Sequence, residues 1–118
     1  MHENPQKAYE YFINEIQNSD DLDKVALCGS ELIKALYVEE KYDEVLKYGT
    51  YILTERKAVH YTSIALDMMN SFVALSDKEG SNQFVEQLAK LAKDAIEQKD
   101  FDNALSFMKH IQVFDEKN

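Results

Sequence analysis

Glycine and proline are almost absent from this chain, and that scarcity limits its fold more than any other feature. Only three glycines and one proline occur in 118 residues. β-rich folds need these residues at their many tight turns, whereas long helices joined by short polar connections do not. The sequence therefore predicts an all-α fold in a single domain, residues 1–118.

Apolar residues recur at helical spacing along the chain, and polar breaks separate the periodic segments. The pattern predicts six helices over about residues 5–18, 22–38, 42–53, 60–75, 83–97 and 101–114, with residues 76–82 as the most turn-like segment. Asp20 and Asp100 are predicted N-caps. Gly49 lies inside a predicted helix, which indicates a close helix crossing at that point. Short turns make neighbouring helices antiparallel.

The last predicted helix carries more apolar residues than one buried face requires. Its predicted core stripe is Phe101, Ala104, Leu105, Met108 and Ile111. Phe107, Ile111 and Phe114 have the spacing of a second apolar edge. A terminal helix is expected to have a polar outer face. We therefore predict that a partner protein or a second copy of the chain covers this edge.

Composition excludes several classes of function. The formal net charge is −9, which disfavours binding to nucleic acid or to an anionic membrane. The apolar runs are too short to cross a bilayer, and the first residues lack the pattern of a signal peptide. Cys28 is the only cysteine, so no internal disulfide can form. These features predict a cytoplasmic protein, and the lysine, glutamate, asparagine and isoleucine bias is typical of a low-GC bacterium or its phage.

Two short segments, 41–46 and 100–105, share one pattern. Each places an aromatic residue, two polar residues, a small or branched apolar residue and a leucine after a polar break. In about the last 30 residues, Leu88, Leu91, Ala92 and Ala95 have the spacing of the first helix of a two-helix repeat. Phe101, Ala104, Met108 and Ile111 have the spacing of its turn and second helix. On these residues the chain resembles the tetratricopeptide repeat.

This resemblance implies helical hairpins stacked into a superhelix, whose concave face accepts a peptide or a helix. The two segments are not separated by a multiple of the period of about 34 residues that this repeat has. An irregular antiparallel helical bundle therefore stays open as the alternative fold.

No catalytic or cofactor motif occurs in the sequence. The three histidines, His2, His60 and His110, have no metal-ligand spacing and are interpreted as surface residues. Cys28 is flanked by apolar residues and is expected to be buried. We therefore expect neither an enzyme nor a cofactor-binding or metal-binding protein.

All seven tyrosines fall within the first 61 residues. Tyr48 and Tyr51 lie off the apolar stripe of their helix, so they either line a groove or pack between helices. The expected function is a protein–protein interaction module, an adaptor or small regulator that binds a peptide or helix of a partner protein. The predicted partner-binding residues are Phe107, Ile111, Phe114, Tyr48 and Tyr51.

Two alternatives to this function remain open. The first is a homo-oligomeric structural protein that dimerises through its C-terminal helix. The second is an enzyme or ligand-binding bundle whose site has no recognisable motif.

Overall fold

The computed structural model describes residues 5–116, and over that range the fold is all-α with no strand. The helices are α1 (Pro5–Asn18), α2 (Leu22–Val38), α3 (Tyr42–Thr50), α4 (Ser63–Ala74), α5 (Lys78–Glu97) and α6 (Phe101–Glu116). A short π-helical turn, η1 (Tyr51–Glu55), continues α3. The predicted all-α class and the six predicted helices are confirmed over the described range.

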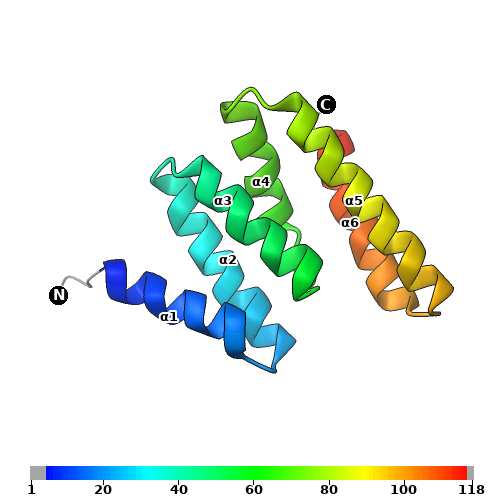
Figure 1. Ribbon diagram of the computed structural model, residues 1–118, viewed down its shortest axis with the longest axis horizontal. Helices are drawn as coiled ribbons and strands as arrows, with labels where there is room; N and C mark the ends of the chain where they lie inside the picture. The colour runs from blue at the N-terminus through cyan, green and yellow to red at the C-terminus, as the bar shows by residue number, and fades with distance from the viewer. Residues whose placement is uncertain (1–4, 117–118) are drawn as a thin grey trace.

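Consecutive helices pair as three hairpins, α1/α2, α3/α4 and α5/α6, which follow one another across the molecule (Figure 1). α2, α4 and α6 pack on one another in that order, and α2 also packs on α3. α3 and α5 both contact α4 but make little or no contact with each other. The described chain measures 48 × 35 × 17 Å, with α1 at one end and the α5/α6 hairpin at the other.

Three of the turns between consecutive helices, α2–α3, α4–α5 and α5–α6, are made without glycine. Glu40, Ser76 and Lys99 each follow the end of a helix with a positive φ, of 60°, 53° and 62°. At each site the next amide bonds back to a carbonyl five residues earlier, for example Lys41 N–H to Leu36 O at 2.9 Å. This is the Schellman arrangement, in which glycine is the usual residue. Left-handed backbone costs a non-glycine residue roughly 1 kcal/mol, which explains how so few glycines suffice.

Aspartate side chains set where α2 and α6 begin. Asp21 caps α2, accepting hydrogen bonds from the amides of Asp23 and Lys24 at 3.0 and 3.4 Å. The prediction that Asp20 is this cap is wrong, because α2 begins one residue later than an Asp20 cap requires. Asp100 is confirmed as a cap, since its carboxylate accepts from the Asn103 amide at 3.3 Å.

α5 begins earlier than the sequence indicates. Asp77 caps this helix by accepting from the Gly80 amide at 2.9 Å. A Cβ on Gly80 would collide with the Asp77 carboxylate, so glycine leaves room for the cap. Most of the predicted turn at 76–82 is therefore the first turn of α5, because the cap outweighs the low helix propensity of glycine.

The predicted close crossing at Gly49 is confirmed. A Cβ on Gly49 would lie 2.5 Å from Met68 Sδ and 2.8 Å from Met68 Cγ. Met68 is fully buried, so it has little space into which it can move. The missing side chain lets α3 and α4 pack at short range.

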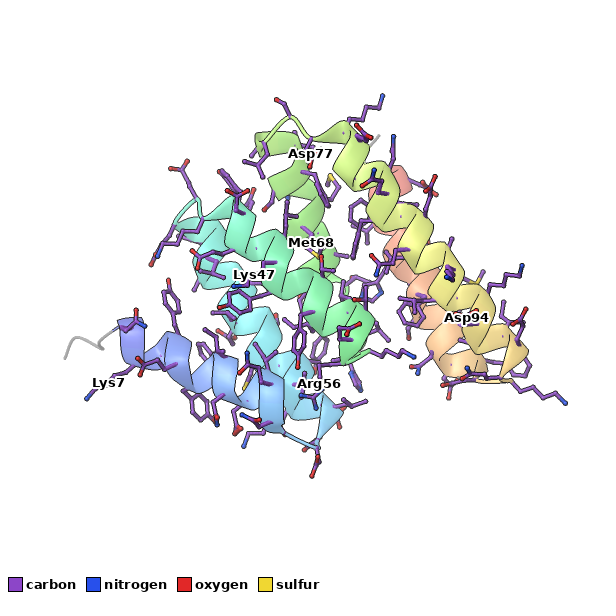
Figure 2. All side chains as sticks on the ribbon, viewed as in Figure 1. Lys7, Lys47, Arg56, Met68, Asp77 and Asp94 are labelled. Carbon is purple, nitrogen blue, oxygen red and sulfur yellow. The ribbon has the colours of Figure 1, made fainter. Side chains whose placement is uncertain are left out.

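Arg56 ties the first hairpin to the end of η1. Its guanidinium donates hydrogen bonds to the backbone oxygens of Ile16 and Ser19, where α1 ends (Figure 2). A helix C-terminus carries partial negative charge and unpaired carbonyls, so a cation is favoured there. η1 precedes Arg56 and buries three consecutive residues, Ile52, Leu53 and Thr54.

The orientation of α6 corrects the predicted assignment of its two apolar faces. Phe107 and Phe114 are buried, at 1% and 0% exposure, whereas Phe101, Leu105 and Met108 of the predicted core stripe are more than half exposed. Phe114 packs against Phe84 and Phe72, with ring centroids 5.7 and 6.3 Å away. Phe114 thereby gains edge and tilted ring contacts in addition to burial.

We expect Arg56→Met to lower the free energy of unfolding by about 2 kcal/mol or more, because two carbonyls lose charge-assisted hydrogen bonds. Urea unfolding followed by circular dichroism measures this loss. Lys7→Met, on the exposed surface of α1, is the matched control and should change stability by less than about 0.5 kcal/mol. Equal effects of the two substitutions would contradict the structural role of Arg56.

The orientation of α6 predicts opposite results for two phenylalanines. Phe114→Ala empties a fully buried site and should cost about 3–5 kcal/mol. Phe101→Ala removes a ring that is 63% exposed and should cost less than about 0.5 kcal/mol. Thermal unfolding of both variants checks this order, and the reverse order would mean that α6 buries its other stripe.

Candidate protein-interaction surfaces

A groove lies between α3 and α5, and α4 contributes to its floor. It has a volume of about 490 Å³. Its lining residues are Asp43, Leu46, Lys47 and Thr50 from α3, Phe72 from α4, and Gly80, Gln83, Phe84 and Gln87 from α5. The groove exists because α3 and α5 each pack on α4 and make little or no contact with each other.

The groove combines an apolar floor with a polar rim. Phe72 and Phe84 form the floor, with ring centroids 6.3 Å apart. They are 7% and 4% exposed, so the surrounding side chains hold them firmly in place. The rim carries the hydroxyl of Thr50 and two side-chain amides, together with one acidic and one basic residue. Both donors and acceptors are therefore present along the rim.

A second cavity lies on the other side of Phe72, between the end of α4 and the start of α5. Its volume is about 390 Å³. Its lining residues are Met69, Phe72, Val73, Ser76, Asp77, Lys78, Ser81 and Asn82. Figure 2 places Asp77 at this junction. The cavity shares Phe72 with the α3–α5 groove.

Tyr48 and Tyr51 are half-buried and pack against the core. The residues of α3 that line the groove are four others, so neither tyrosine lines it. The ammonium of Lys47 lies 5.2 Å from the centre of the Tyr48 ring, which adds a cation–π contact beside the groove. A direct role of either tyrosine in partner binding stays a prediction.

The outer face of α6 is the third surface. Phe101, Leu105 and Met108 are 63%, 53% and 51% exposed, and they follow one another at spacings of four and three residues. They lie on one side of the helix, with Asp102 and Lys109 exposed beside them. Of the predicted partner-binding residues on this helix, Phe107 and Phe114 are buried and Ile111 is half-buried. The exposed apolar face therefore consists of three of the five residues that the sequence assigned to the core, whereas Ala104 of that stripe is buried.

His110 is buried, contrary to the prediction that it is a surface residue. Its Nδ1 lies 2.7 Å from Ser106 O, and its Nε2 lies 3.2 Å from Tyr61 O. Both oxygens accept only, so a neutral ring donates to one of them and a protonated ring to both. Burial outweighs these two carbonyls and lowers the pKa of His110 from its ordinary value of 6.5.

His60 and Cys28 lie in different environments. His60 is exposed, and its Nε2 lies 2.9 Å from Asp23 Oδ1. Cys28 is buried, as predicted, and burial raises the pKa of its thiol. His2 lies outside the described residues. Among the side chains that the structure describes, no three from histidine, cysteine, aspartate or glutamate gather as a metal site would require.

Over the described helices, none is both long enough and apolar enough to cross a membrane. Comparison with known proteins found no matching family model, no similar curated protein and no similar solved structure. The fold and the chemistry of these surfaces are therefore the basis for any inference about function.

His110 predicts a pH dependence of stability. Because the folded state lowers its pKa, the unfolded state binds the proton more tightly. The stabilising contribution of the neutral ring is complete above pH of about 6.5 and is lost as pH falls through the lower, folded-state pKa. The expected slope is at most about 1.4 kcal/mol per pH unit.

Urea unfolding of the wild type and His110→Gln between about pH 5 and 8 measures this slope. The variant should lose this part of the pH dependence, whereas the control His60→Gln should keep it. Identical slopes in the wild type and His110→Gln would show that His110 does not titrate as described.

Proposed function

We propose that this chain is a cytoplasmic protein–protein interaction module, an adaptor or small regulator, built as a tetratricopeptide-like array of hairpins. The observation that carries this proposal is the open groove between α3 and α5, where an apolar floor meets a hydrogen-bonding rim. Arrays of helical hairpins provide grooves of this kind for peptide segments.

The chemistry of the groove favours an extended peptide over a helix. The amides of Gln83 and Gln87 and the hydroxyl of Thr50 can pair with backbone N–H and C=O groups of a bound segment. A helical partner satisfies those backbone groups internally, so it would leave the rim without partners. An extended segment can also direct one or two apolar side chains toward Phe72 and Phe84.

Charge adds a preference for a basic partner. The chain carries a net charge of −9, and the rim of the groove holds Asp43 together with one basic residue, Lys47, so the net charge carries this preference and Asp43 offers the local contact. A peptide with an apolar residue next to a lysine or arginine therefore fits this site best. The cation would lie near Asp43, and the apolar side chain would cover the aromatic floor.

Selection from a random peptide library displayed on phage tests this function. The wild-type chain should enrich peptides with an apolar residue beside a basic one. Gln87→Arg places a long cation in the groove and should weaken binding of these peptides at least about tenfold, or 1.4 kcal/mol. Gln17→Arg, on the exposed surface of α1, adds the same charge far from the groove and should leave binding unchanged.

The position of the bound peptide distinguishes groove binding from adhesion elsewhere. In two-dimensional ¹H–¹⁵N spectra of the chain, amides of residues 43–50 and 80–87 should shift on adding a selected peptide. Failure to enrich any peptide, or shifts confined to α6, would exclude the groove as the binding site.

A further inference from the structure

The outer face of α6 has the arrangement of a helix-pairing seam. We define the α6 seam as Phe101, Leu105, Met108 and Gln112, which follow one another at spacings of four, three and four residues and are all exposed. Spacings that alternate between three and four residues are those of the a and d positions of a coiled coil, where side chains of two paired helices interlock. α6 packs on α5 and α4 through its other faces, so the three apolar side chains of the seam, Phe101, Leu105 and Met108, are more than half exposed in the single chain.

Charges beside the seam indicate what covers it. Asp102 and Lys109 are both exposed and lie along the same edge of the seam, seven residues apart. If a second α6 pairs antiparallel about a twofold axis just after Leu105, midway between residues 102 and 109, Asp102 of each copy lies opposite Lys109 of the other. The pairing therefore brings together two pairs of opposite charges and three large apolar side chains from each copy.

A parallel pairing lacks this complementarity. In parallel helix pairs, one edge of each seam faces the opposite edge of its partner. The opposite edge of the α6 seam holds Ala104, which is buried, and Ile111, which is half-buried. Asp102 and Lys109 would then face groups that carry no charge and that already pack within their own chain.

We propose that this chain forms a homodimer in solution by antiparallel pairing of α6 with α6 of a second copy. The dimer does not require the α3–α5 groove, which lies on other helices and remains open in both copies. One helix pair is a small interface, so association is weak and depends on concentration. The net charge of −9 on each copy opposes association at long range and is screened by salt.

Sedimentation equilibrium of the full chain, from about 1 μM to about 1 mM in physiological salt, tests this dimer. The wild type should change from monomer to dimer across this range. Leu105→Lys places like charges next to the twofold axis and should weaken association at least about tenfold. Leu27→Lys is the matched control, because Leu27 on α2 is 55% exposed and Leu105 is 53% exposed.

A charge exchange tests the antiparallel geometry. Asp102→Lys alone sets lysine opposite Lys109, and Lys109→Asp alone sets two acids opposite each other, so each should weaken the dimer. The double variant Asp102→Lys/Lys109→Asp restores opposite pairs and should recover wild-type association. Circular dichroism of each variant shows whether the fold is retained.

Several results would overturn the proposal. A strict monomer at every concentration excludes the dimer, and equal effects of Leu105→Lys and Leu27→Lys place its interface elsewhere. Failure of the double variant to recover association excludes the antiparallel register. None of these results bears on peptide binding in the groove, which Gln87→Arg tests separately.

Discussion

The packing of Phe114 between Phe72 and Phe84 is the contact on which the arrangement of the second half of the chain depends. The three rings come from α6, α4 and α5, and their centroids lie 5.7 to 6.3 Å apart. Rings in this arrangement gain from edge and offset contacts as well as from burial. Once Phe114 occupies this site, the rotation of α6 is set, and Phe101, Leu105 and Met108 turn outward.

The same cluster connects the two surfaces that we propose for binding. Phe72 and Phe84 form the floor of the α3–α5 groove, and Phe114 supports them from α6. The groove therefore has a rigid base, while the α6 seam lies on a different helix face. In the other half of the molecule, Arg56 has a comparable structural role, since it joins α1 to the segment after η1.

Several local features were predictable because they depend on neighbours in the sequence. Gly49 indicated a close crossing, and the structure shows Met68 filling the space that a Cβ would need. Asp100 was identified as a cap, and Cys28 as a buried residue.

The choice between Asp20 and Asp21 as the cap of α2 was not predictable. Both are aspartates and cap equally well, so only the residue at which α2 begins decides between them. His110 is buried because α6 turns toward the α3–α4 connection, which no local pattern indicates.

The amino-acid sequence alone determined that the chain is helical, that it forms six α-helices and, except for the start of α5, roughly where they begin and end. Scarce glycine and proline, apolar periodicity and capping residues act locally, so they can be identified without a fold. Only the tertiary structure decided which of two apolar stripes of α6 is buried and whether α3 and α5 enclose a groove. Both stripes have helical periodicity, and the difference lies in how well Phe107 and Phe114 fill space provided by α4 and α5. That fit depends on residues far away in the sequence.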